Sequence, residues 1–254
     1  MSDVRLDKRL ESQLDAFRKK VDADANEVIL HAFPSKIIEL QQLIVDSDAE
    51  SSPFHSSHGT SHTDSTVYPP SSASEVSGPD SKKRKLDHDP SSMNGFGADS
   101  GSPRFTQRML ANQHLQAVHT IVKDQCTEIS LLCDKVKLWV NLTMPKIEDG
   151  DNFGVQIQEE VLNELHRSQE SAINMRDVAR QSHLNRAKIC SKIIKYPNVE
   201  DYALALEEHD ERQLYLARQN IRDLRNIYAV LTDIIHKNLA KLRAPKGNNA
   251  VGLY

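Results

Sequence analysis

Apolar residues recur at helical spacing over four long stretches of the chain. In the first stretch, residues 3–45, leucine, phenylalanine, valine and isoleucine follow one another three or four positions apart, from Leu6 to Ile44. Pro34 lies inside this pattern. Because proline lacks an N–H and clashes with the preceding turn, we expect a kink or break near Phe33. The apolar stripe is narrow, so this helix must pack on other helices.

The same spacing predicts three further helices, over residues 104–144, 154–195 and 199–243. Ser102-Pro103 is typical of a helix start, with serine at the N-cap and proline at the first helical position. Tyr196-Pro197-Asn198 separates the last two helices, and Asn198 is the expected N-cap of the fourth. Four long helices with short connections at two of three junctions predict an all-α antiparallel four-helix bundle.

Residues 46–103 have a different composition. They contain sixteen serines, six prolines and five glycines, and few apolar side chains that could offset the entropy of ordering. We therefore divide the chain into an N-terminal helix (1–45), a disordered linker (46–103) and a three-helix remainder (104–254). Within the linker, Lys82, Lys83, Arg84 and Lys85 form a basic cluster. In an exposed segment such a cluster indicates a nuclear localisation signal, although a merely solvated charge run has the same composition.

Composition and charge narrow the class of protein. The 254 residues are 38% hydrophobic and 27% charged, which suits amphipathic helices, and the net charge of −4 gives no reason to expect direct nucleic-acid binding. Cys126, Cys133 and Cys190 lie in helical patterns without metal-ligand spacing and are expected to be buried thiols in a reducing compartment. We expect no secretory signal and no membrane span, since no apolar run reaches 18 residues.

Motifs for catalysis or metal binding are few. None of the eleven histidines follows a glutamate by three positions, as a di-iron bundle requires, and no nucleophile elbow, Walker A loop or zincin motif is present. We therefore expect no enzyme, no cofactor and no metal. His55, His58 and His62 have loose metal-like spacing, but their serine-rich surroundings predict no fixed geometry.

The loop between the second and third long helices has its own pattern, Met144–Glu160. Pro145 ends the preceding helix, Gly150 and Gly154 allow unusual backbone angles, and Asp149, Asp151 and Asn152 favour turns and helix N-caps. We interpret it as a rigid acidic tip that contacts a partner. A calcium-loop spacing runs from Asp149 to Glu160, but Phe153 at its fifth position offers no oxygen ligand, so calcium is not expected.

Three stretches resemble one known family. Pro145–Glu160, PKIEDGDNFGVQIQEE, closely resembles the activation loop of the 11S proteasome activators, the REG family, and Ala32–Lys36 and Arg186–Tyr202 support the match. The resemblance covers nearly all of the chain except the linker. It implies a heptameric ring of four-helix subunits around a channel. Such a ring caps the proteasome core particle at its alpha-subunit ring, opens the gate without ATP and stimulates peptide hydrolysis.

The resemblance also implies particular residues. It assigns the activation loop to Lys146, Ile147, Glu148, Asp149, Gly150, Asp151, Asn152, Phe153 and Gly154. It assigns the tail that inserts between proteasome alpha subunits to Val251, Gly252, Leu253 and Tyr254, and a weaker channel-side role to Lys188. The family has two consecutive asparagines where this chain has Asp151-Asn152, and an aspartate there loses the amide donor and adds charge.

The subtype and the alternatives complete the prediction. The KKRKLD cluster and the final Leu-Tyr resemble the gamma type of the family, which implies a nuclear homo-heptamer, possible also in the cytoplasm, that acts on protein and peptide substrates. The alternative is a nuclear helical scaffold that docks partners through its linker and opens no gate. Asn185, Arg186 and Lys188 could line a subunit interface or an aqueous pore, or form an ordinary solvated face.

Overall fold

The computed structural model describes residues 7–69, 107–146 and 153–246. Most of this part of the chain is helical, and its only β-type pairing is a single bridge between Tyr68 and Arg108. The elements are α1 (Lys8–Glu27), a π-helical turn (Val28–Ala32), α2 (Phe33–Asp46), α3 (His58–Ser61), α4 (Gln113–Thr143), α5 (Phe153–Lys195) and α6 (Asp201–Arg243).

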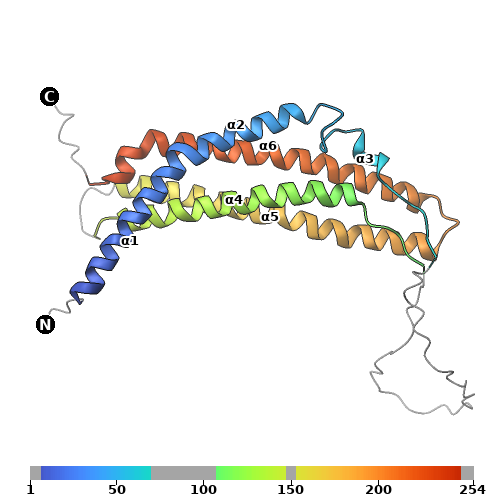
Figure 1. The fold of residues 1–254 in the computed structure, drawn as a ribbon, viewed down its shortest axis with the longest axis horizontal. Coiled ribbons are helices and arrows are strands. Elements are labelled where there is room, and N and C mark those ends of the chain that lie inside the picture. Colours follow the sequence, from blue (N-terminus) through green and yellow to red (C-terminus); the bar gives the residue numbers. More distant parts are fainter. Residues whose placement is uncertain (1–6, 70–106, 147–152, 247–254) are drawn as a thin grey trace, which may run out of the picture.

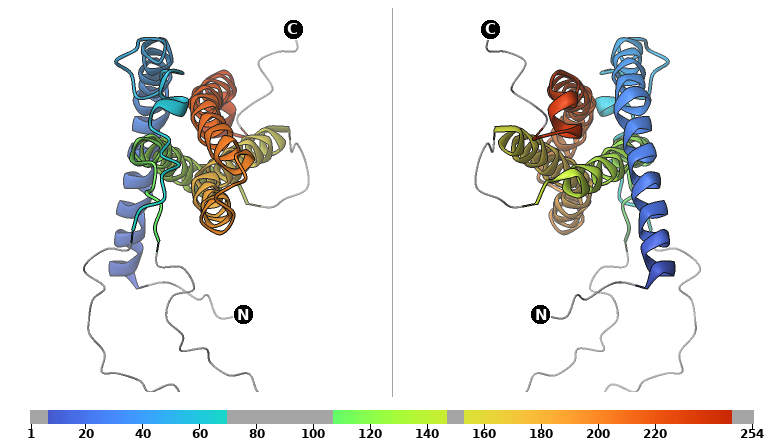
Figure 2. Two further views of the ribbon diagram at one scale, coloured as in Figure 1. Left: turned by 90° about the vertical axis from the view of Figure 1, so that its right-hand side faces the viewer. Right: turned by 90° about the vertical axis from the view of Figure 1, so that its left-hand side faces the viewer.

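The long helices form an antiparallel bundle. In Figure 1 the bent first helix, α4, α5 and α6 run in alternating directions along one axis. α2 packs on α6, whereas α1 crosses the bundle beside α4, as both views of Figure 2 show. The predicted all-α four-helix bundle is therefore confirmed. α6 begins at Asp201 with Glu200 at its N-cap, and not with Asn198, which the sequence suggested.

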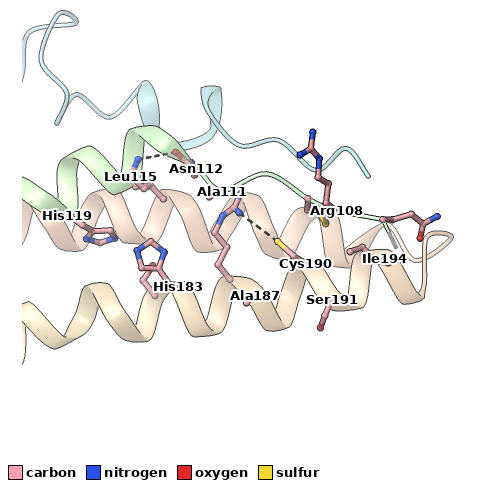
Figure 3. Close-up of a pocket in the computed structure, with 14 residues that line it drawn as sticks. Arg108, Ala111, Asn112, Leu115, His119, His183, Ala187, Cys190, Ser191 and Ile194 are labelled. Atoms are coloured by element: carbon pink, nitrogen blue, oxygen red, sulfur yellow. Dashed lines mark hydrogen bonds between the residues drawn. The ribbon is translucent and has the colours of Figure 1, made fainter. Parts of the chain in front are cut away.

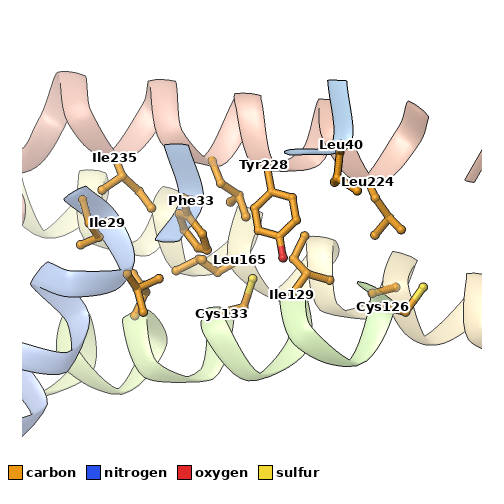
Figure 4. Packing of buried hydrophobic residues seen from close by; sticks show 14 of the residues in the cluster. Ile29, Phe33, Leu40, Cys126, Ile129, Cys133, Leu165, Leu224, Tyr228 and Ile235 are labelled. Atoms are coloured by element: carbon orange, nitrogen blue, oxygen red, sulfur yellow. The ribbon is translucent and has the colours of Figure 1, made fainter. Parts of the chain in front are cut away.

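The core lies between α2, α4, α5 and α6. Phe33 meets Tyr228 edge-on with ring centroids 5.6 Å apart, and Ile129 and Leu165 are fully buried nearby (Figure 4). Trp139 is also buried, and its Nε1 donates to Asp22 Oδ1 at 2.8 Å, which ties α4 to α1. Large side chains thus fill the bundle interior, while the polar atom of the indole keeps a partner, as buried polar groups require.

The cysteines fit the expectation of buried thiols. Cys126 and Cys133 are in the core, Cys190 is half-buried, and all three are free. Burial raises the pKa of Cys126 to about 11 and that of Cys133 to about 12. Both core thiols therefore stay protonated and unreactive at neutral pH.

The predicted irregularity near Phe33 is a π-helical turn. Pro34 has no N–H for the carbonyl of Leu30, so the regular bonding pattern cannot continue. Instead, the N–H of Phe33 bonds the carbonyl of Val28, five residues back. After the turn, Lys36 Nζ lies 2.6 Å from a carboxylate oxygen of Glu128, which fixes α2 against α4. The extra residue in the turn redirects the chain between α1 and α2.

One 18-residue window within Lys8–Asp46 is apolar enough, by composition, to cross a membrane. The core helix of a bundle passes the same test. Here Ile29, Phe33 and Leu40 from this stretch are buried against the other helices. The bundle core therefore accounts for part of the apolar character of this helix, while Leu30, Ile38 and Val45 stay exposed.

The first part of the linker is ordered, contrary to expectation. Residues 47–69 follow α2 along α6 and include α3, a single helical turn that packs on α6. Phe54 is only 1% exposed and belongs to the hydrophobic core. The serine-rich composition predicted disorder because few side chains could offset the entropy cost of ordering. Here the burial of Phe54 and polar contacts to α6 offset that cost. Residues 70–103, with Lys82, Lys83, Arg84 and Lys85, lie outside the described residues.

At the end of the bundle near α3, the buried carboxylate of Asp210 on α6 contacts side chains from separate parts of the sequence. It is fully buried, and one of its oxygens accepts hydrogen bonds from Thr63 Oγ1 and Asn112 Nδ2, each at 3.0 Å. Arg186 Nε lies 3.1 Å from the other oxygen, and His209 Nδ1 is also 3.1 Å from it. Asp210 therefore connects α5, α6, the segment after α3 and the residue before α4.

Two sequence expectations change at this cluster. The second long helix begins at Gln113 and not at residue 104, because Asn112 is its N-cap and accepts from the Leu115 N–H at 3.0 Å (Figure 3). Before it, Arg108 pairs with Tyr68 through backbone hydrogen bonds. Arg186 is not a surface or pore group, because it is 8% exposed and also donates to the Leu110 carbonyl at 2.9 Å.

Replacing Asp210 with asparagine should strongly destabilise the fold. Burial alone would raise the pKa of Asp210, but hydrogen bonds from His209 and Asn112 and the charge of Arg186 outweigh it and lower the pKa. The carboxylate thus stabilises the fold above its unfolded pKa of about 3.9, and this contribution is lost as pH falls through the folded value. Asp210→Asn leaves Arg186 buried without its partner, which should cost about 3–5 kcal/mol at pH 7.

Urea unfolding at pH 7 and at successively lower pH measures this cost. The difference between Asp210→Asn and the wild type should begin to shrink as the pH falls below about 4, where the unfolded carboxyl takes up its proton, and should disappear as the pH passes the lower pKa of the folded carboxylate. Asp233→Asn is the matched control, since Asp233 pairs with Lys237 on the exposed face of the same helix. Equal stabilities of the two variants at pH 7 would contradict the role of Asp210.

Candidate functional site

Three helix ends meet at the end of the bundle opposite α3. α4 ends at Thr143, α5 begins at Phe153 and α6 ends at Arg243, all on the left in Figure 1. The described chain stops at Lys146, resumes at Phe153 and stops again at Lys246, at this same end. The stems of the predicted activation loop and of the predicted tail therefore lie together.

A close backbone contact joins the two stems. A Cβ atom added to Gly154, in the first turn of α5, would lie 2.1 Å from the carbonyl oxygen of Pro245 and 2.6 Å from its Cα. Only glycine allows so close an approach. The sequence suggested that Gly154 permits an unusual backbone angle, but the residue is helical, and the neighbouring chain is what requires it. The start of α5 is thus pressed against the end of α6.

One turn further along α5, a buried amide holds all three helices. Gln158 is fully buried, and its Nε2 donates to the Leu242 carbonyl of α6 at 3.0 Å and to Thr143 Oγ1 of α4 at 3.2 Å. Sequence reasoning missed this residue. The signal was available, because Gln158 lies three and seven positions before the buried Val161 and Leu165, and thus occupies a core position of the helical pattern.

The outer surface of this end carries basic and aromatic groups. Lys246 Nζ donates to the carbonyl of Lys146 at 3.3 Å, a second link between the tail stem and the loop stem. Arg243 Nη2 donates to Asn26 Oδ1 at 2.5 Å, which adds α1 to the assembly. Phe153 is 57% exposed at the start of α5. Exposed aromatic and arginine side chains on a fixed framework are typical of a contact surface.

The predicted site residues divide into two groups. Lys146, Phe153 and Gly154 are described and lie at this end, whereas Lys188 is exposed on α5, about 50 Å along the helix from Phe153. The remaining residues lie outside the described part of the chain. They are Ile147, Glu148, Asp149, Gly150, Asp151 and Asn152 of the loop, and Val251, Gly252, Leu253 and Tyr254 of the tail.

Comparisons with known proteins agree with this geometry. Two family models match, "Proteasome activator PA28, N-terminal" over residues 8–55 and "Proteasome activator PA28, C-terminal" over residues 108–252. Proteasome activator complex subunit 3 of Homo sapiens is 33% identical over 262 residues, which cover 99% of this chain and 98% of that protein. Proteasome activator 28 of Dictyostelium discoideum is 30% identical over 187 residues, 74% of this chain and 79% of that protein.

Solved structures show the same bundle. The 11S subunit of the Plasmodium falciparum proteasome, PA28, has a TM-score of 0.72 and 28% identity, and the match covers 97% of this chain and 99% of that one. A proteasome–11S activator complex matches with a TM-score of 0.60 over 93% of this chain and 98% of that one. At 14% identity it supports the fold alone.

The fold and the joined stems define a class of protein: an elongated helical bundle that presents one loop and one terminal segment from the same end. Within this class, the chain belongs to the proteasome activator PA28 family.

Gly154→Ala should destabilise the contact between α5 and α6. The added methyl group meets backbone atoms that cannot rotate away, so the helix ends must separate, at a cost of about 1–3 kcal/mol in the free energy of unfolding. Gly59→Ala is the control, because its Cβ would lie 3.2 Å from Glu211 Cγ, a flexible side-chain atom that can move. Denaturant unfolding measures both, and equal stabilities would show that the close approach at Gly154 is unimportant.

Proposed function

We propose that this chain activates the proteasome core particle without ATP. Tail residues 251–254 bind the alpha-subunit ring of the core, and activation loop residues 145–154 favour the open gate. The observation that carries the proposal is the joining of the loop stem and the tail stem by Gly154, Gln158 and Lys246. A tail seated on the core would place the loop on the same surface.

The joined stems give this mechanism a physical basis. A short tail makes few contacts and binds weakly alone, but several tails on one assembly raise the affinity by about 10²–10⁴ through avidity. A loop that had to be ordered on binding would lose interaction free energy to conformational entropy. Gln158 and the Gly154–Pro245 contact order both ends of the framework beforehand, so more of the binding free energy acts on the gate.

Exposed apolar stripes support assembly of several chains. Leu131, Leu138 and Leu142 share one face of α4, and Ile173 and Leu184 share one face of α5; each is more than 40% exposed. Stripes of this kind usually mark protein–protein contacts. Different faces that bind head to tail around an axis close into a ring. We propose the homo-heptameric ring that the family resemblance implies, with Lys188 facing its channel.

The proposed role is regulatory and not catalytic, in keeping with relatives that are named as activators. A nuclear location, with some protein also in the cytoplasm, is part of the proposal and rests on Lys82, Lys83, Arg84 and Lys85. Proteins and peptides degraded by the core would be the substrates that pass the ring. Calcium, other cofactors and direct nucleic-acid contacts have no part in this mechanism.

Deleting Gly247–Tyr254 should abolish activation. Latent core particle is mixed with the full chain or the truncated chain, without ATP, and hydrolysis of a fluorogenic peptide is followed. We expect strong stimulation by the full chain and none by the truncated chain, because the tails supply attachment. Light scattering should show the same assembly of seven 28.6 kDa chains for both. Failure of an intact heptamer to bind or stimulate the core would favour the alternative, a nuclear helical scaffold.

Asp151→Asn restores the amide that the family has at this loop position. If the carboxylate weakens gate opening, the variant should raise the maximal rate of peptide hydrolysis at saturating activator. The activator concentration that gives half of this rate reflects binding through the tails, so it should stay within about twofold of the wild-type value. Asp233→Asn, on the exposed face of α6, makes the same change of charge away from the loop. A maximal rate equal to that of the wild type would show that gate opening tolerates Asp151.

A further inference from the structure

Three histidines from distant parts of the sequence meet at the side of the bundle near α3. His58 begins α3, His62 directly follows it as its C-cap, and His114 lies in the first turn of α4. One ring nitrogen of each lies within 4.8 Å of one ring nitrogen of the other two. The sequence drew attention to His55, His58 and His62 but predicted no metal site, because their serine-rich segment was expected to lack fixed geometry. It did not identify His114 as a neighbour.

The spacing of the nitrogens suits a small divalent cation. His62 Nε2 and His58 Nδ1 are 3.3 Å apart. Two nitrogens bound to a tetrahedral zinc ion at about 2.0–2.1 Å are separated by about 3.3–3.4 Å. The ring of His114 stacks on that of His62, with centroids 4.5 Å apart, and lies 4.7 Å from that of His58. To share one ion with the other two, the ring of His114 would have to turn out of this stack, because the nitrogen lone pair that binds a metal lies in the plane of the ring.

Backbone carbonyls fix two of the rings in the tautomer that a metal requires. His58 Nε2 lies 3.2 Å from the carbonyl oxygen of Glu50, and His114 Nε2 lies 2.8 Å from that of Pro53. An N–H at each Nε2 donates to these oxygens and leaves each Nδ1 with a lone pair. Metal-bound histidines usually donate their other N–H to a carbonyl or carboxylate in this way.

We propose that His58, His62 and His114 bind one zinc ion per chain, with water at the fourth position. Three imidazole ligands and no thiolate suit zinc. His62 would release its hydrogen bond to His58 and present Nε2 to the ion. The ion would connect the ordered segment after α2 to the start of α4, and so stabilise both, because a metal bound by the native state alone stabilises folding.

This site is separate from the loop and tail stems. α3 packs on α6 on the right of Figure 1, whereas the loop and tail stems lie on the left. The zinc proposal is therefore independent of the proposed function and is tested separately from it. The tail deletion and the zinc measurement can give opposite results without contradiction.

Calorimetric titration of the full, tag-free chain tests the proposal. The chain is first treated with a chelator and dialysed to remove bound metal. Zinc chloride should bind with a stoichiometry of one per chain and raise the melting temperature. Cobalt(II) in place of zinc should give the visible absorption of a tetrahedral site. His114→Gln and the surface variant His62→Gln should each weaken zinc binding by more than about 100-fold, since loss of a supporting outer partner alone costs 10–100-fold.

His166→Gln is the matched control, because His166 is exposed on α5 beside Glu170 and outside the triad. It should bind zinc as the wild type does. Circular dichroism checks that the metal-free variants keep the helical content of the wild type. The proposal is wrong if the wild type shows neither heat nor a melting shift at a hundredfold excess of zinc, or if His62→Gln and His114→Gln both bind zinc as tightly as the control.

Discussion

The close approach of α5 to the end of α6 is the constraint on which the working end of this protein depends. Gly154 lets the two backbones touch, and the fully buried Gln158 bonds both α6 and α4 one turn deeper. A buried amide with these partners is costly to displace. The three helix ends therefore form one rigid platform, and a force on the tail stem reaches the loop stem through a few short contacts.

The opposite end of the bundle is held by a different kind of interaction. Asp210 and Arg186 form a buried ion pair to which Asn112 and Thr63 add hydrogen bonds. Such a buried pair is costly to break, because loss of one partner leaves the other charge buried and uncompensated. Thr63 and Asn112 lie close to the two described edges at residues 69 and 107, which are joined directly by the backbone pairing of Tyr68 with Arg108. The long helices between the two ends, each of 43 residues in α5 and α6, act as stiff spacers of about 65 Å.

Local patterns predicted the helices well, because their apolar periodicity is also the periodicity of the core. The sequence located α5 and α6 within about two residues and the kink beside Pro34. It failed where distant contacts decide. The order of residues 47–69 depends on the burial of Phe54 and on packing against α6. The polar contacts of Thr63, Asn112 and Arg186 meet at Asp210, up to 147 positions away. The Gly154–Pro245 contact and the meeting of His62 with His114 are likewise invisible to local spacing.

The most direct test of the central claim is an electron cryomicroscopy map of this protein bound to the core particle. The claim is that loop and tail act from one end of each bundle. The map should therefore show the end formed by Lys146, Phe153 and Lys246 facing the alpha-subunit ring, with residues 147–152 and 251–254 in contact with it. A complex in which the end near α3 faces the ring, or in which only the tails reach it, would contradict the account.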